Sequence, residues 1–154
     1  MKEEFLNTSL ASFLLEYEES TILQLQFDFE KKGKKSNPQS PFAKKIENLL
    51  EEYFSGRRKT FEVEINPSGT SFQKKVWNIV KKIPFGRTLT YQDIAKRLGN
   101  KNLARAVGQA LKSNKIAIII PCHRVIAKNG IGGYSGRNHL DIKRKLLKIE
   151  NVSI

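Results

Sequence analysis

The chain has little of what secreted, membrane-spanning or metal-binding proteins require. Its 154 residues include one cysteine, so no internal disulfide can form, which favours a reducing intracellular compartment. No apolar run reaches the ~20 residues that cross a membrane, and the early acids of the N-terminus lead us to expect no signal peptide. With one cysteine and two histidines, His123 and His139, we expect no zinc site and no other bound metal.

Acidic residues are scarce in the second half of the chain. Residues 66–154 hold 18 Lys and Arg against 3 Asp and Glu, whereas residues 1–65 hold 10 against 12. The net charge of +13 is therefore carried by the C-terminal part, which favours a polyanion, nucleic acid in particular, as its partner. The alternative is a lysine-rich solvated surface, but enrichment of that kind usually adds acids as well.

The first part of the chain predicts strands and one helix. Apolar residues at helical spacing over 42–54 predict a helix that ends at Gly56. Alternation over 61–65 predicts a strand. A similar alternation over 21–29 predicts another strand, with one face formed by Leu23, Leu25, Phe27 and Phe29.

A Pro- and Gly-containing turn at 66–69 divides the sequence. We predict an N-terminal domain over residues 1–65 and a C-terminal domain over residues 66–154. The fold class that follows is α/β, with a small N-terminal sheet-plus-helix domain and a mainly helical C-terminal domain.

The helical half carries clear start and stop signals. Ser71 is predicted to cap a helix that stops at Pro84, and Thr90 with Asp93 three residues later forms a capping box. A further helix is predicted over about 103–112. Two short helices joined by a tight turn in a cationic domain predict a winged-helix-like helix-turn-helix.

The second helix of this pair presents a polar face. Arg105, Gln109 and Lys112 lie opposite its apolar residues, and Gly108 lies between them. This face is a candidate DNA-binding surface, although any amphipathic helix has an exposed polar face. Glycine within a helix costs about 1 kcal/mol relative to alanine, which favours a role for Gly108 in close approach to a partner.

Two further segments frame the cysteine. The apolar run 116–120 is too short for an independent helix and is predicted to be a buried extended segment that leads to Cys122. Residues 138–150 predict a closing helix, capped by Asn138 and carrying apolar residues on one face.

Cys122 is the one thiol that needs an explanation. A cysteine attacks as its thiolate, so it needs a base, and His123 follows it directly. Neighbouring side chains diverge, so a bridging water is the natural relay. A histidine base also needs an acceptor on its other nitrogen, and the C-terminal part offers only three acids, of which Glu150 is a candidate beside Asp93 and Asp141. The alternative is a buried, inert cysteine.

The sequence PCHRV at 121–125 resembles the active-site signature of the O6-alkylguanine-DNA alkyltransferases, or methylated-DNA–protein-cysteine methyltransferases. The resemblance spans essentially residues 66–150 and is looser over 50–58 and at Phe61. Further family motifs occur in the same order and spacing: Gly69–Gln73, Val76–Trp77, Ile83–Gly86, Thr90–Tyr91, Ala104–Gly108, Asn114 and Gly133–Gly136.

This resemblance implies direct DNA repair. An alkyl group passes irreversibly, and once per molecule, from O6-alkylguanine or O4-alkylthymine in double-stranded DNA to Cys122. The implied protein is a cytoplasmic, nucleoid-associated monomer that uses no cofactor and has no membrane partner.

The resemblance also assigns roles around the acceptor Cys122. His123 resembles the base that acts through water, and Glu150 the residue that holds it. Asn114 resembles a hinge between recognition helix and active-site segment, and Tyr91 the residue that rotates the nucleotide and hydrogen-bonds the guanine ring.

Other implied roles concern the DNA and the flipped base. Arg105 resembles the finger that fills the space left by the extruded base. The carbonyls of Cys122 and Val125 would bind the exocyclic amine, and Tyr134 and Ser135 resemble the closing loop. Two features depart from relatives: Lys115 stands where many of them have a proline after the hinge, and the loop between Val125 and Tyr134 is one residue shorter than in some of them.

Three competing hypotheses remain at this point. A lesion binder without transfer activity is disfavoured because such relatives lack the acceptor cysteine. A helix-turn-helix regulator with a redox-sensing thiol would explain the charge, but it predicts dimers and sequence preference. A cysteine hydrolase is disfavoured, because such an enzyme uses water to regenerate its nucleophile. A thioether on the cysteine offers no such route.

Overall fold

The computed structural model describes residues 1–33, 38, 40–134 and 139–153. They form two compact units: unit 1 is Met1–Ser68 with Lys115–Ala117, and unit 2 is Gly69–Asn114 with Ile118–Ile154. The mixed α/β class, with a small N-terminal sheet, is confirmed. The functional division after residue 65 stays a prediction.

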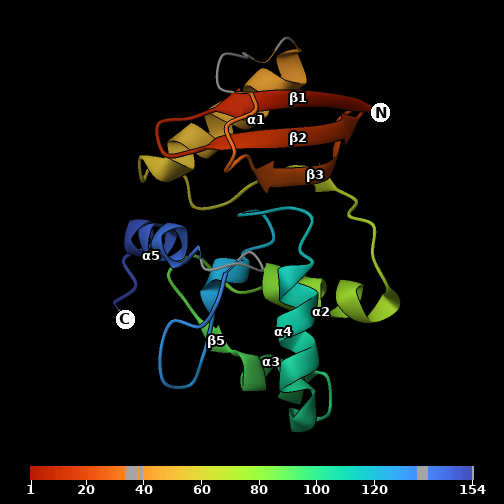
Figure 1. The fold of residues 1–154 in the computed structure, drawn as a ribbon, viewed down its shortest axis with the longest axis vertical. Helices are drawn as coiled ribbons and strands as arrows, with labels where there is room; N and C mark the ends of the chain where they lie inside the picture. The colour runs from red at the N-terminus through yellow and green to blue at the C-terminus, as the bar shows by residue number, and fades with distance from the viewer. Residues whose placement is uncertain (34–37, 39, 135–138, 154) are drawn as a thin grey trace. The chain divides into compact units, whose positions relative to one another are not determined.

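Unit 1 is built on a four-stranded sheet in the order β1-β2-β3-β4. The first three strands are antiparallel, and the short β4 pairs parallel to β3. Helix α1 contacts β1 on one face of the sheet (Figure 1) and begins after its cap Ser40. The bounds are β1 Lys2–Asn7, β2 Ser12–Glu18, β3 Thr21–Phe27, α1 Pro41–Phe54 and β4 Glu64–Ile65.

A bulge in β3 makes the predicted strand face wrong at Leu23, although Leu25 is buried as predicted. Tyr17 pairs with Ile22 and Glu16 pairs with Gln24, which leaves Leu23 as an extra residue and shifts the alternation by one. Ile22 and Leu25 are therefore fully buried, while Leu23 is only partly buried. Phe29 lies beyond the strand and is 41% exposed. The strand predicted over 61–65 is also shorter than expected, because only its last two residues pair.

The helices of unit 2 pack against one another (Figure 1): α2 Ser71–Lys81, α3 Tyr91–Arg97 and α4 Ala104–Lys112. The indole Nε1 of Trp77 on α2 donates to the Ala110 carbonyl of α4 over 2.9 Å. The predicted Thr90–Asp93 capping box is confirmed at the start of α3. The predicted cap Ser71 is wrong, because Thr70 caps α2 with Gln73 as its partner and Ser71 is the first helical residue.

A short parallel pair connects these helices to the cysteine. Strand β5 (Leu89–Thr90) precedes α3 and pairs with β6 (Val125–Ile126), which follows the 3₁₀ turn Cys122–Arg124. Helix α5 (Leu140–Ile149) contacts that turn. Asn138, the predicted cap of this helix, lies outside the described residues. In the part of the chain that the structure describes, every helix is too short or too polar to span a membrane.

The run 116–120 is buried as predicted, but it is not extended throughout. Ile116 pairs with Leu25 of β3, and the chain then turns, with Ile118 at a φ of +70°. A β-branched residue in this left-handed region is strained by about 1–3 kcal/mol. The sequence-based expectation failed because the first two residues of the run belong to unit 1 and the last three belong to unit 2, so no single strand contains it.

Substitution at Ile118 tests this backbone conformation. Ile118→Ala and Ile118→Gly both remove the buried side chain, but only glycine relieves the left-handed strain. We expect the glycine variant to be at least as stable as the alanine variant in urea unfolding. At the buried Ile46 of α1, the matched control, glycine should be about 1 kcal/mol less stable than alanine. The same order at both positions would contradict the left-handed assignment.

Candidate active site

Cys122 lies at the start of a 3₁₀ turn, and the residue as a whole is 8% exposed. The Cys122 N–H and the Asn114 side-chain amide both donate to the Ile120 carbonyl, over 2.8 and 3.0 Å. Burial raises the pKa of the thiol to about 12, against a lowering by hydrogen bonding to Asn114 and by the charge of Lys143. The resting cysteine is therefore a protonated thiol that needs a base.

The carboxylate of Glu150 collects the hydrogen bonds of the site. Glu150 is 2% exposed and directly follows α5. Its Oε2 contacts His123 Nε2 at 2.6 Å and accepts from Arg124 Nη2 at 3.1 Å. Its Oε1 accepts from Arg124 Nε at 2.8 Å and from the Gly86 N–H at 3.1 Å. One carboxylate thus joins the histidine, the arginine and the turn before β5.

The other two acids of this region have other hydrogen-bond or ion-pair partners. Asp93 accepts from the Thr90 N–H at the start of α3. Asp141 is exposed on α5, with Arg144 at 3.9 Å. Among the three acids that the sequence left open, Glu150 is the one that contacts His123.

His123 is fully buried, and its pKa is lowered, chiefly by burial. The charges of Arg124 and Lys143 lower it further, and the neighbouring carboxylate of Glu150 opposes this shift. The ring is therefore neutral at pH 7. Because a carboxylate faces Nε2, that nitrogen carries the proton and Nδ1 has the lone pair of a base. Arg124 also donates to the Ile83 carbonyl over 2.6 Å, and its guanidinium lies 5.9 Å from the ring centre of Phe85.

Lys143 is a site residue that sequence reasoning missed. Its side chain is fully buried, and its ammonium donates to the Val125 carbonyl at 2.7 Å and the Gly133 carbonyl at 2.9 Å. Burial lowers the pKa of this amine to about 8, although Cys122 raises it. The available signal was helical spacing, because Lys143 shares one face of α5 with Leu146 and Leu147.

Two tyrosines lie close enough to Cys122 for its charge to affect them. Burial raises the pKa of both Tyr91 and Tyr134, so both phenols stay protonated. A Cβ added to Gly132, whose φ is +76°, would lie 2.7 Å from the Tyr91 hydroxyl, so the loop needs glycine at this point. Ser135, predicted beside Tyr134, lies outside the described residues.

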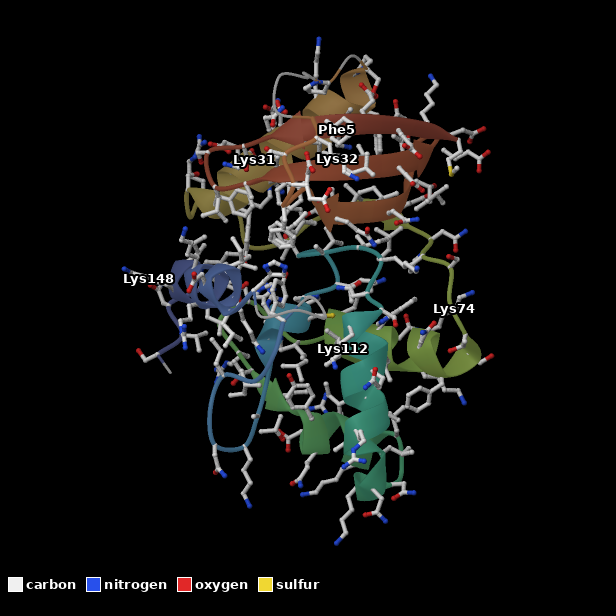
Figure 2. The ribbon with its side chains drawn as sticks, viewed as in Figure 1. Phe5, Lys31, Lys32, Lys74, Lys112 and Lys148 are labelled. Carbon is white, nitrogen blue, oxygen red and sulfur yellow. The ribbon has the colours of Figure 1, made fainter. Side chains whose placement is uncertain are left out.

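Apart from Tyr91 at the start of α3, the residues predicted to bind DNA lie on α4, outside this buried cluster. Arg105, Gln109 and Lys112 are exposed. A Cβ added to Gly108 would meet nothing within 4 Å, so packing within the protein does not require glycine there. Figure 2 shows Lys112 on α4 and other lysines of unit 2, such as Lys74 and Lys148, on different helices.

The arrangement is suited to nucleophilic attack by sulfur. It combines a buried thiol, a neutral histidine held by a carboxylate, and protonated phenols that can donate hydrogen bonds. Among the described residues, no group of three or more His, Cys, Asp and Glu side chains could hold a metal ion.

Comparison with known proteins gives consistent matches. Residues 71–152 match the family described as "6-O-methylguanine DNA methyltransferase, DNA binding domain". A methylated-DNA–protein-cysteine methyltransferase of Methanosarcina acetivorans is 53% identical over 110 residues, which cover 71% of this chain and 69% of the relative. The crystal structure of Mycobacterium tuberculosis OGT in complex with DNA has a TM-score of 0.83 at 34% identity, covering 97% of this chain and 92% of that one. An S. pombe structure in complex with damaged DNA containing O6-carboxymethylguanine has a TM-score of 0.51 at 34% identity and covers 56% of this chain and 82% of its own.

Glu150→Gln tests how strongly this carboxylate stabilises the fold. The amide keeps the shape but leaves the buried Arg124 without an ionised partner, so we expect a loss of about 3–5 kcal/mol in urea unfolding. Glu52→Gln is the control, because the Glu52–Arg58 pair is partly exposed and its loss should cost under about 1 kcal/mol. Equal effects of the two substitutions would contradict this role for Glu150.

Proposed function

The chain belongs to the 6-O-methylguanine DNA methyltransferase family, and from this premise we propose that it repairs DNA by moving the alkyl group of O6-alkylguanine to Cys122. A carbon–sulfur bond forms as the bond between that carbon and O6 breaks, and guanine leaves with the electron pair and takes up a proton. The thioether product has no route back to the thiol, so each molecule acts once. The observation that carries this proposal is the buried Cys122 next to the His123–Glu150 pair.

His123 supplies the base. The thiol is protonated at rest, and Nδ1 of the neutral ring can take its proton through a bridging water. Glu150 then stabilises the imidazolium, because its Oε2 already faces Nε2. Arg124 keeps that carboxylate ionised by two hydrogen bonds. The relay through water rather than direct contact follows from the divergence of neighbouring side chains.

The flipped guanine would be held largely by fixed main-chain groups. The carbonyls of Cys122 and Val125 accept from its exocyclic amine, and Lys143 fixes the Val125 carbonyl by donating a hydrogen bond to it. Tyr91, a protonated phenol, donates to the guanine ring and so stabilises the charge that develops on it. Tyr134 closes over the base, and Ser135 is predicted to join it. O4-alkylthymine presents the same kind of alkylated oxygen and is the second proposed substrate.

The DNA is proposed to bind at α3 and α4, which act as a helix-turn-helix. The exposed Arg105, Gln109 and Lys112 face the duplex, and Gly108 lets the backbone of α4 approach it closely. The O6 atom of a stacked guanine cannot be reached by a buried thiol, so the nucleotide must be extruded. Arg105 fills the space that the base leaves.

Single turnover is the most direct consequence for kinetics. Duplex DNA carrying O6-methylguanine, supplied in excess over the protein, should be repaired to a plateau of one lesion for each active molecule. The measurement is the repaired fraction after digestion and chromatography, with Cys122→Ser as the inactive control. Repair that continues beyond the plateau would mean that the thiol is regenerated.

Arg105→Ala separates base extrusion from phosphate contact. Without the finger, extrusion should become harder by a few kcal/mol, so we expect slower transfer from bound duplex and nearly unchanged transfer from free O6-benzylguanine. Lys112→Ala, on the same face of α4, is the control and should weaken duplex affinity while the rate in the bound state stays the same. Equal slowing of Arg105→Ala on duplex and free base would rule out the finger role.

A further inference from the structure

The segment Lys115–Ala117 belongs to unit 1, although the residues on either side of it belong to unit 2. The Leu25 N–H of β3 donates to the Lys115 carbonyl over 2.9 Å, and the Ala117 N–H donates to the Leu25 carbonyl over 2.7 Å. Ile116, between them, is fully buried. The chain that leads from α4 to Cys122 is therefore strand-paired to the N-terminal sheet on its way.

A hydrogen bond between Asn114 and Ile120 closes the same loop close to Cys122. The Asn114 side chain donates across the loop to the Ile120 carbonyl, and this carbonyl also accepts from the Cys122 N–H. Asn114 hydrogen-bonds the Cys122 side chain as well. A displacement of the paired segment Lys115–Ala117 would therefore be transmitted to the residues that orient the thiol.

The turn between the paired segment and Ile120 is strained. Ile118 has a φ of +70°, and its side chain is 2% exposed. Such a conformation persists only where the flanking structure fixes both of its ends. Pairing with Leu25 fixes the end before Ile118, and the hydrogen bonds to Ile120 fix the end after it.

We propose that unit 1 positions the nucleophile: the pairing of Leu25 with Lys115–Ala117 holds the loop so that Asn114 and Cys122 stay aligned for transfer. Leu25 and Ile116 act in this as positioning residues, since neither touches the reacting atoms. The inference rests on the proposed alkyl transfer, because the alignment of Asn114 and Cys122 serves to make that transfer faster. It gives the N-terminal sheet a task in the reaction.

The test compares two buried isoleucines of unit 1. Ile116→Ala and Ile46→Ala remove the same atoms, but only the first loosens the paired segment. Both proteins are assayed for transfer from excess O6-benzylguanine at a temperature where circular dichroism shows them folded. Ile116→Ala should be slower than wild type by about tenfold or more, whereas Ile46→Ala should stay within about twofold.

Duplex affinity distinguishes positioning of the nucleophile from general structural damage, because a damaged fold would lose affinity as well as rate. In a Cys122→Ser background, Ile116→Ala should bind duplex DNA as the parent does, because α4 is held within unit 2 by its packing against α2 and α3. Equal rates for the two alanine variants, or a loss of affinity that parallels the loss of rate, would overturn the proposal. If either alanine variant does not fold, Ile116→Val and Ile46→Val carry the same comparison. A wild-type protein that takes no benzyl group would instead refute the proposed function itself.

Discussion

The carboxylate of Glu150 is the group on which the arrangement of the site depends. Burying a negative charge is unfavourable unless donors surround it, and the turn at Gly86, the side chain of Arg124 and the ring of His123 supply them. These donors come from segments distant in the sequence, so the carboxylate orients the histidine and anchors α5 at the same time. Lys143, on α5 itself, fixes the Val125 carbonyl and the loop at Gly133. Helix α5 and the residue that follows it thus hold both His123 and the Val125 carbonyl.

The surroundings of Cys122 favour a thiol that reacts only when its base takes part. Burial raises its pKa to about 12, so few resting molecules carry a thiolate. His123, neutral and held by Glu150, can accept the proton when a substrate is in place. A buried thiol is also protected from other electrophiles, which matters for a protein that can react once. The net positive charge of residues 66–154, which include Cys122, favours a nucleic-acid partner.

Features that depend on neighbours in the sequence could be predicted, and features that depend on distant partners could not. The capping box of Thr90 and Asp93 lies within one helical turn, and the alternation of apolar residues identified the strand β3. The bulge at Leu23 depends on the register with β2, which one strand alone does not specify. Lys143 was overlooked because a lysine is normally exposed, and only the carbonyls of Val125 and Gly133 explain its burial. The pairing of Ile116 with Leu25 joins residues far apart in the chain, and nothing local to either signals it.

The central claim is that the alkyl carbon ends on the sulfur of Cys122. The most direct measurement uses duplex DNA whose O6-methylguanine carries a deuterated methyl group, followed by trypsin digestion and tandem mass spectrometry of the protein. The account predicts the labelled methyl on the peptide of residues 116–124, at its cysteine, in an amount equal to the guanine restored in the DNA. Label on another residue, or restored guanine with an unlabelled protein, would contradict it.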